Sequence, residues 1–361
     1  MSVVTHELSR YLALAGLRGI GLRRKLALLE AMPLDLIWQQ AAQARVPGLS
    51  TYQCQQLLTP SENITSALAW YAEADDHHIL TLADPRYPLA LRAIEDPPLV
   101  LFVQGNLDSL NQPSIAMVGS RNAPPPSLDL AQEWAAQLAQ MGLGVISGLA
   151  IGIDGASHRG ALEHGQTVAV LGCGLRHCYP KRHDQLAAQI RKQGALVSEF
   201  WPQQTVRAQH FPQRNRIVSG LSYGVLVVAA AKRSGSLITA RLAAEQGREV
   251  FAVPGSVRDP HAAGCHYLVQ QGAKLVTSPV DLVEELCPQW QAEPPSVQPE
   301  VTSKLPHPGL LDSVGYETTP VDLVVQRSQL PVAEVLERLI ELELDGWVQA
   351  VPGGYMRLRG R

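Results

Sequence analysis

The sequence predicts an α/β protein built around a doubly wound, mostly parallel sheet, with smaller helical parts at both ends. Short apolar runs alternate with amphipathic helical patterns between residues 113 and 286, which is typical of a sheet covered by helices on both faces. Six prolines between residues 288 and 308 indicate an extended linker before a C-terminal tail. The chain has 361 residues, 46% of them hydrophobic, which is enough for two or three domains with cores.

The elements follow in order along the chain. Residues 1–112 begin with helical patterns and end in an extended, proline-marked stretch. We then expect strands near 114–118, 143–146, 167–171, 195–198, 223–229, 249–252 and 274–276. We expect helices near 127–140, 155–164, 181–192, 214–221, 237–246 and 264–270. The tail predicts two helices, a longer helix at 331–344, and a hairpin in which PGG joins WVQAV to YMRL.

These patterns divide the chain into four parts. We predict a helical domain at 1–78, a sheet domain at 79–286, a linker at 287–308 and a small domain at 309–361. The longest strongly apolar run, Val225–Ala231, is far shorter than the roughly 18–20 residues of a membrane span, and no signal core precedes Arg18. The odd number of scattered cysteines, without a C-x-x-C pair, indicates reduced thiols in a cytoplasmic protein. The cysteines are Cys54, Cys173, Cys178, Cys265 and Cys287.

The charge distribution predicts an anionic ligand for the sheet domain. The whole chain carries a net charge of −3, but residues 113–286 hold 16 basic and 12 acidic side chains, a net charge of +4. In open α/β sheets, ligands bind at the carboxyl ends of the strands, where many of these basic residues lie. A long basic rim there favours a polyanion. The rim comprises Arg121, Arg176, Lys181, Arg182, Arg207, Arg214, Arg216, Lys232, Arg233 and Arg258.

The turn VGSRNAPPPS at 118–127 follows the first strand of this domain. Gly119 permits close backbone approach, Ser120 and its neighbours present N–H groups, and Arg121 supplies a positive charge for a phosphate. The alternative is an ordinary strand-to-helix turn. A dinucleotide fingerprint is excluded, because it needs G-x-G-x-x-G and this turn has one glycine followed by three prolines.

Two further loops open helices. SGLAIGIDGASHRGAL at 147–162 is glycine-rich, and Asp154 in it is a candidate helix cap as much as a functional residue. AKRSGSLITARLAAEQG at 231–247 follows a buried strand, so a helix N-terminus there predicts a second anion site. Ser236 alternatively only caps that helix. The candidates in this second loop are Lys232, Arg233, Ser234, Gly235 and Ser236.

The segment HFPQRNRIVSGLS at 210–222 places two arginines at an expected helix start. Arginine is unfavourable at a helix N-terminus, which already carries partial positive charge. Glu199 can neutralise one of Arg214 and Arg216, so we expect the surplus charge to serve an external anion. Phe211 and Trp201 either stack on nucleic-acid bases or pack as core.

Two further motifs resemble a zinc site and a hydrolase nucleophile, but their spacing or surroundings exclude both interpretations. LGCGLRHCYPKRH at 171–183 contains two cysteines and two histidines, but their spacing matches no common structural zinc site. GLSYG at 220–224 matches the nucleophile elbow G-x-S-x-G, yet a helix precedes it and a strand follows, which is the reverse of what the elbow requires. We therefore expect no metal, no cofactor and no catalytic residue.

Taken together, the stretches resemble one bacterial family, DNA-processing protein A, also called Smf. VGSR, SGLAIGIDGASHRGAL, VLGCGL, FPQRNRIVSGLS, SGSLITARLA, FAVPG and GAKLV occur in the family's order over the whole middle domain. LRGIGLRRKLALLE at 17–30 resembles the helix-hairpin-helix of its sterile-alpha-motif-like domain, and the tail resembles its winged helix. The chain departs from the family pattern at Arg176 and Ala229, where acidic residues are usual, and at His266, where asparagine is usual.

The resemblance implies an extended Rossmann-like domain that binds single-stranded DNA. It further implies a homodimer, without established catalytic activity, that protects incoming strands and loads the recombinase RecA during natural transformation. The motif positions imply a DNA pocket of Gly119, Ser120, Arg121, Phe211, Arg214, Asn215 and Arg216, to which Ser234, Gly235 and Ser236 are added. The alternative is a phosphoribohydrolase-like enzyme, but SGSLITARLAAE lacks the glycine pair and the glutamate of P-G-G-x-G-T-x-x-E.

The two ends of the chain carry further expectations. Arg18, Arg23, Arg24 and Lys25 beside the glycines at 19 and 21 either hold a phosphate or form a solvated helix face. The candidate recognition helix at 331–345 has five acids and one arginine, a net charge of −4. Such a helix is repelled by DNA phosphates, so we predict that it contacts protein or modulates the basic core.

Overall fold

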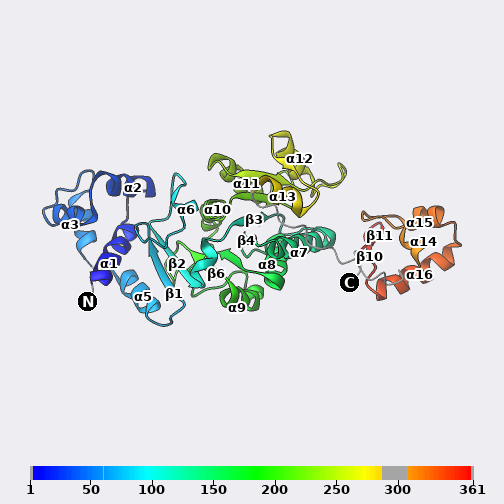
Figure 1. Cartoon of the computed structure of the whole chain (residues 1–361), viewed down its shortest axis with the longest axis horizontal. Coiled ribbons are helices and arrows are strands. Elements are labelled where there is room, and N and C mark those ends of the chain that lie inside the picture. Colours follow the sequence, from blue (N-terminus) through cyan, green and yellow to red (C-terminus); the bar gives the residue numbers. More distant parts are fainter. Residues whose placement is uncertain (1–2, 60, 287–306, 359–361) are drawn as a thin grey trace. The chain divides into compact units, whose positions relative to one another are not determined.

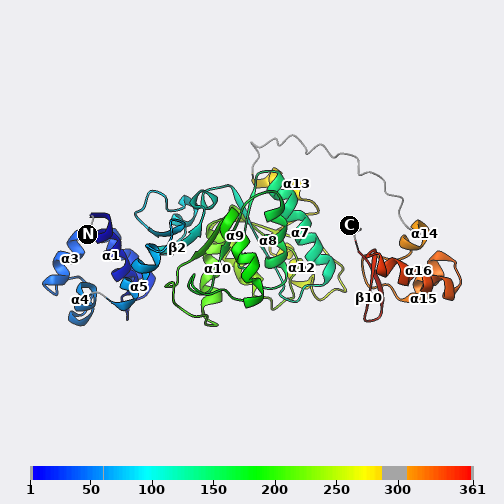
Figure 2. The same ribbon diagram turned by 90° about the horizontal axis from the view of Figure 1, so that it is seen from below.

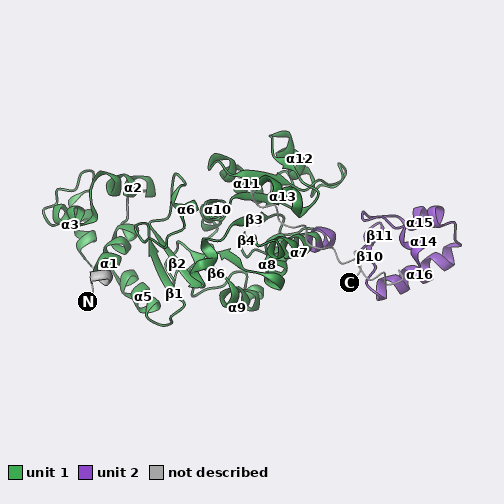
Figure 3. Cartoon of the chain, viewed as in Figure 1, with its two compact units in different colours: residues 1–123, 130–290 green, residues 124–129, 291–361 purple. Residues whose placement is uncertain are grey.

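A computed structural model describes residues 3–59, 61–286 and 307–358. The chain divides into two compact units, residues 1–123 with 130–290 and residues 124–129 with 291–361 (Figure 3). The predicted linker lies largely outside the described residues. No helix among those described is long and apolar enough to cross a membrane.

The first unit begins with helices that share a core with the edge of the sheet. Leu12, Ile37 and Trp70 are fully buried and belong to the same apolar cluster as Phe102 of the sheet. Ser50 and Gln53 form a reciprocal capping box at the start of one helix. The predicted helical N-terminus is therefore confirmed. The helices are α1 (Val3–Gly16), α2 (Leu22–Ala31), α3 (Leu34–Ala42), α4 (Thr51–Leu58) and α5 (Glu62–Tyr71).

A nine-stranded sheet forms the centre of this unit, in the order β1-β2-β6-β5-β4-β3-β7-β8-β9. The strands from β3 to β9 are parallel, whereas β2 runs antiparallel to both β1 and β6. This confirms the mostly parallel, doubly wound sheet. The strands are β1 (His77–Thr81), β2 (Val100–Gly105), β3 (Ser114–Val118), β4 (Gly144–Ser147), β5 (Thr167–Val170), β6 (Ala195–Ser198), β7 (Gly224–Val227), β8 (Glu249–Ala252) and β9 (Lys274–Leu275).

Helices cover both faces of the sheet, as Figures 1 and 2 show. They connect the strands in the alternating order that the sequence predicts. The connections include α6 (Leu89–Arg92), α7 (Pro125–Gln140), α8 (Ile153–His164), α9 (Asp184–Gln193), α10 (His210–Gly220), α11 (Ser236–Glu245), α12 (Ala263–Gln270) and α13 (Pro279–Leu286). Two short 3-10 turns, η1 and η2, span Leu107–Leu110 and Lys181–His183.

The order in which strands are added to the sheet reverses between β3 and β7, although the two strands are parallel. From β3 the chain builds outwards through β4, β5 and β6, and then α10 returns it to the opposite side of β3, where β7 pairs. In doubly wound sheets a crevice opens at this switch point, outside the carboxyl ends of the two strands. The topology thus brings the turns after β3, β4 and β7 together.

Helix α10 corrects one expectation. It begins at His210, four residues before the predicted start, so Arg214 and Arg216 lie in its middle rather than in its first turn. Pro212 does not prevent this, because N–H groups in the first turn of a helix make no hydrogen bond within the helix, and a proline there removes none. The helix-dipole argument for surplus charge at these arginines therefore fails.

Residues 307–358 of the second unit form three helices and a hairpin, as predicted for a winged helix. Leu311, Val324, Val335 and Leu339 are fully buried and form a separate core. The hairpin strands pair antiparallel from Val348–Arg357 to Val351–Gly354. The elements are α14 (Pro308–Leu311), α15 (Val321–Ser328), α16 (Val332–Leu344), β10 (Val348–Val351) and β11 (Gly354–Arg357).

Candidate nucleic-acid interface

A cavity of about 600 Å³ occupies the crevice between the ends of β3 and β7. Nine of the twelve predicted site residues line it. They are Gly119, Ser120, Arg121, Phe211, Arg214, Asn215, Ser234, Gly235 and Ser236. Arg216, Lys232 and Arg233 do not line it. Thr239, Asn122, Gly148 and Asp154 complete much of the wall.

The turn after β3 requires glycine at 119. A Cβ atom there would lie 2.5 Å from Ile153 Cγ1 and 2.8 Å from the Ala229 carbonyl oxygen. The next backbone N–H, that of Ser120, donates to this same carbonyl at 2.7 Å. The turn is therefore held between the start of α8 and the end of β7, with Arg121 exposed at its tip.

Arg214 forms part of the floor of the crevice. Its side chain is only 4% exposed, and its Nη1 donates to the carbonyl of Val170 at the end of β5. The guanidinium lies against Gly148, where any Cβ atom would overlap it. Its Nε has no hydrogen-bond partner among the described residues. Glycine at 148 is therefore what makes room for a buried cation beneath the cavity.

A buried carboxylate faces this cation. Asp154 accepts from the backbone N–H groups of Gly148 at 3.1 Å and Ala150 at 3.3 Å, so it holds the preceding loop rather than capping α8. Burial raises the pKa of Asp154, and the charge of Arg214 opposes the shift. Burial lowers the pKa of Arg214, and Asp154 opposes that shift.

Arg216 lies on another side of α10. Its Nη1 and Nη2 donate to the two Glu199 carboxylate oxygens at 2.9 and 2.7 Å, and its Nε donates to Asp96 at 3.1 Å. Arg216 is 5% exposed. The expectation that acids are too few for the two arginines is wrong. Glu199 and Asp96 pair with Arg216, and the charge of Asp154 acts on Arg214.

Three side chains form a cluster beside the crevice, which we call the Arg121–Phe211–Tyr179 cluster. The Arg121 guanidinium carbon lies 5.3 Å from the Phe211 ring centroid, and the Tyr179 ring lies 5.6 Å from it on an exposed segment. Tyr179 is 47% exposed, and the sequence analysis did not include it among the site residues. Tyr179 lies nine residues after the end of β5, among basic residues of the rim, and this position is the sequence signal that could have found it.

Two other aromatic residues close to α10, Phe200 and Trp201, pack against neighbouring rings. The Phe200 ring stacks on His210 at 4.0 Å, and the Trp201 ring lies 5.9 Å from that of Phe102 on β2. Phe211, by contrast, is half-buried and lines the cavity. Phe211 therefore faces the crevice, whereas the partly buried Trp201 packs against the apolar cluster away from it.

The start of α11 forms the remaining wall. Ser234 Oγ and Ser236 Oγ are hydrogen-bonded at 2.7 Å, and the Ser236 N–H donates to Ser234 Oγ at 3.3 Å. Lys232 and Arg233 precede them as exposed side chains. Among the described residues, no cluster of three or more His, Cys, Asp or Glu side chains is arranged to hold a metal ion.

Comparisons with known proteins identify relatives along most of the chain. Residues 78–287 match the family described as DNA recombination-mediator protein A, and residues 293–354 match the DprA winged helix domain. Protein Smf of Escherichia coli (strain K12) is 47% identical over 321 residues, covering 86% of each chain. DNA processing protein DprA of Bacillus subtilis (strain 168) is 44% identical over 221 residues, covering 61% of this chain and 74% of its own.

Two solved structures are also similar. The X-ray structure of DNA processing protein A from Streptococcus pneumoniae aligns with a TM-score of 0.68 and 35% identity, covering 79% of this chain and 99% of its own. A structure of DNA processing protein A from Helicobacter pylori, described for its single-stranded DNA binding mode, aligns with a TM-score of 0.54 and 27% identity. It covers 59% of this chain and 96% of its own.

Proposed function

This chain belongs to the DNA recombination-mediator protein A family, known as DprA or Smf, and we propose on that basis that its switch-point crevice binds single-stranded DNA. The observation that carries the proposal is the convergence of the Arg121–Phe211–Tyr179 cluster with two serine- and glycine-rich turns. The Helicobacter pylori relative, described for its single-stranded DNA binding, supports the same ligand.

Each part of the crevice suits one part of a DNA strand. The hydroxyl groups of Ser120 and Ser234 line the cavity and suit phosphate oxygens, and Arg121 adds an exposed positive charge. Phe211 and Tyr179 offer ring faces to bases. A single strand can turn its bases onto such rings, whereas a duplex keeps its base faces stacked.

Arg214 has a positioning role in this proposal. Its guanidinium is buried between Gly148 and the end of β5. It therefore adds positive potential beneath the bound strand and holds the loop at Gly148 in place. Arg216 is assigned to the fold, because Glu199 and Asp96 occupy its donors. Lys232 and Arg233 remain proposed as outer phosphate contacts, since both are exposed next to the lining residues.

The test is oligo-dT binding by fluorescence anisotropy at several salt concentrations. Phe211→Ala removes a stacking ring, for which we expect about 5-fold to 150-fold weaker binding. Arg121→Gln removes one phosphate contact and should lower the salt slope by about 0.7. Lys192→Gln is the control, because this exposed lysine lies in the last turn of α9, just before the amino end of β6 and away from the carboxyl ends of the strands. If Phe211→Ala and Arg121→Gln both bind like the control, the site assignment is wrong.

We also propose that the protein acts as a homodimer that protects single strands and loads RecA onto them. Family membership supports this proposal. RecA filament assembly on oligonucleotides already covered by a single-strand-binding protein provides the test. Wild-type protein should accelerate assembly, and Phe211→Ala should not. Acceleration by both proteins would separate RecA loading from the crevice, and sedimentation as a monomer would refute the dimer.

The nucleotide-processing alternative predicts turnover instead of binding alone. Its catalytic glutamate has no counterpart at the start of α11, where the sequence is SGSLIT. Incubation of purified protein with nucleoside monophosphates, followed by chromatography of the products, tests it. We expect no hydrolysis, and hydrolysis lost with substitution in the crevice would support the enzyme instead.

A further inference from the structure

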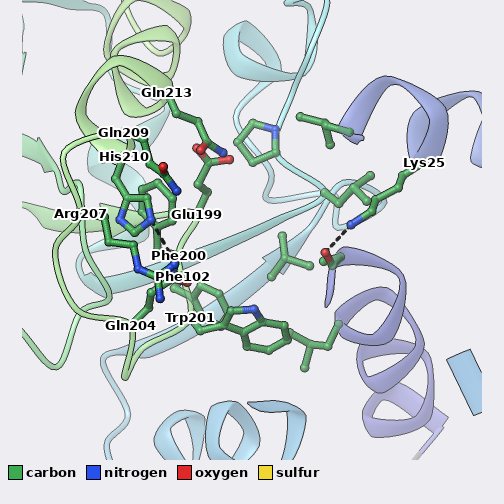
Figure 4. Close-up of a pocket in the computed structure, with 16 residues that line it drawn as sticks. Lys25, Phe102, Glu199, Phe200, Trp201, Gln204, Arg207, Gln209, His210 and Gln213 are labelled. Atoms are coloured by element: carbon green, nitrogen blue, oxygen red, sulfur yellow. Dashed lines mark hydrogen bonds between the residues drawn. The ribbon is translucent and has the colours of Figure 1, made fainter. Parts of the chain in front are cut away.

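A second cavity lies on the other flank of the same helix. It has a volume of about 390 Å³ and is bounded by α1, α2, β2 and the segment that leads into α10. This volume lies within the range of about 300–1,000 Å³ that small-ligand pockets occupy. Figure 4 shows Lys25 on one side, Arg207 and His210 across from it, and the Trp201 ring between them.

The charges that line this cavity are unbalanced. Lys25 is 8% exposed, and its Nζ donates to the Ala15 carbonyl at 2.6 Å, at the end of α1. Arg207 is exposed, and neither side chain has a carboxylate within ion-pair distance among the described residues. Glu199 is the acid in the lining, but it is paired with Arg216.

The wall beside these cations is aromatic and rich in amides. Phe102 and Trp201 supply ring surface, and the carboxamides of Gln204, Gln209 and Gln213 face the cavity as well. A ligand that combines a flat ring, hydrogen-bonding groups and negative charge matches this wall. A nucleotide is such a ligand.

The first turns of α10 separate this cavity from the crevice. Ala208, Phe211 and Asn215 line the crevice, whereas Arg207, His210 and Gln213 line the second cavity. Adjacent residues of one helix thus serve both spaces. A strand that leaves the crevice around the start of α10 therefore arrives beside Arg207.

We propose that the second cavity is a nucleotide subsite, in which Lys25 and Arg207 balance phosphate charge and Trp201 faces the base. This inference rests on the proposed DNA binding at the crevice. It gives the helix-hairpin-helix segment at 17–30 a role, because Lys25 on α2 becomes a DNA contact. The nucleotide is either the continuation of the bound strand or a free nucleoside monophosphate.

The length of the strand tests the first source. Oligo-dT of about 4 to 16 nucleotides is titrated against the full chain by anisotropy. For wild type, affinity should rise once the strand spans both spaces. Arg207→Gln and Lys25→Met should each remove that rise, by about 5-fold or more, while leaving the shortest strands unaffected. Lys192→Gln is the matched charge control.

The outcomes separate this inference from the proposed function. If no strand binds wild type, the crevice proposal fails. If all lengths bind and the Arg207 and Lys25 variants follow wild type at every length, the second cavity does not hold the continuation of the bound strand. Titration of dTMP by calorimetry tests the second source, and binding lost in Arg207→Gln supports a free nucleotide. Binding of neither dTMP nor longer strands through these side chains overturns the inference.

A proton measurement distinguishes a DNA contact from a purely structural lysine. Burial lowers the pKa of Lys25 to about 8. A phosphate beside it should raise that pKa, so binding of long strands near pH 8.5 should take up protons. Glu199, Arg207 and His210 are the other titratable groups in the lining, and Lys25→Met keeps all three. Calorimetry in buffers of different ionisation enthalpy should show proton uptake for wild type and not for Lys25→Met.

Discussion

At the scale of single residues, the two arginines of α10 have different roles. The sequence predicts both as helical and as residues of the ligand site, and in the structure Arg214 lines the cavity whereas Arg216 does not. It also predicts Glu199 as the partner of one of them, which is Arg216, but it could not predict that Asp96, 120 residues away, would meet Arg216 as well. Such contacts depend on tertiary folding, which brings distant loops to one helix face. Tyr179 was missed for the same reason, because its partner Phe211 lies 32 positions later.

The ion pairs of Arg216 make it a stability residue. Arg216→Ala leaves the nearly buried Glu199 without its partner, so we expect a loss of about 3–5 kcal/mol in the free energy of unfolding. Arg121→Gln should lose little, because Arg121 is exposed. Urea denaturation of both variants measures the difference. Equal midpoints would contradict the assignment of Arg216 to the fold.

Lys25 predicts an unusual pH dependence. Its pKa falls from the usual 10.5 to about 8 on folding, because of burial. Between these values the unfolded chain binds more protons, so the Lys25 contribution to stability should increase as pH rises from 8 to 10.5. Relative to Lys25→Met, wild type should gain up to about 3 kcal/mol across that window. Urea unfolding at both pH values tests this, and a constant difference would refute it.

At the scale of elements, strands were the most predictable feature. Each of the seven expected strands is present within two residues at either end, because buried parallel strands are short, apolar and bounded by turns. β1 and β2 were recognised only as an extended stretch, since their proline-marked surroundings conceal the antiparallel pairing. The start of α10 was misplaced because HFPQ has no helix-capping signature.

The turn after β3 offers a test with a control from the same cavity. Gly119→Ala should displace the turn, since its Cβ would lie 2.5 Å from Ile153, and should weaken oligo-dT binding at least about 5-fold. Gly235→Ala should weaken binding less than Gly119→Ala, because no protein atom lies within 4 Å of a Cβ built there and the turn after β3 stays in place. Anisotropy compares the two. Equal effects would mean that the turn geometry does not govern binding.

At the scale of the whole molecule, the sequence predicts the division into a sheet unit and a winged-helix unit. The second unit has a core of its own, centred on Leu339. Its longest helix, α16, carries Glu334, Glu337, Glu341 and Glu343, with Arg338 paired to Glu334. The acidic character follows from sequence alone. The molecule that α16 contacts does not follow from the sequence, because that contact also depends on the surface of the partner molecule.

The acidic α16 leads to a prediction for the second unit. A fragment of residues 307–361 should show no salt-dependent binding to duplex DNA, because phosphates and the helix carry like charge. Its folding is checked by circular dichroism, and binding by anisotropy at low salt. Duplex binding that weakens as salt increases would overturn the prediction.

The Arg121–Phe211–Tyr179 cluster has a kinetic consequence. Its rings and guanidinium are already in contact within the protein, so the cost of ordering on association falls mainly on the DNA. A strand must unstack before its bases reach the rings. Thymine runs, whose neighbours stack weakly, should therefore associate faster than adenine runs of equal length, even where the two equilibrium affinities agree.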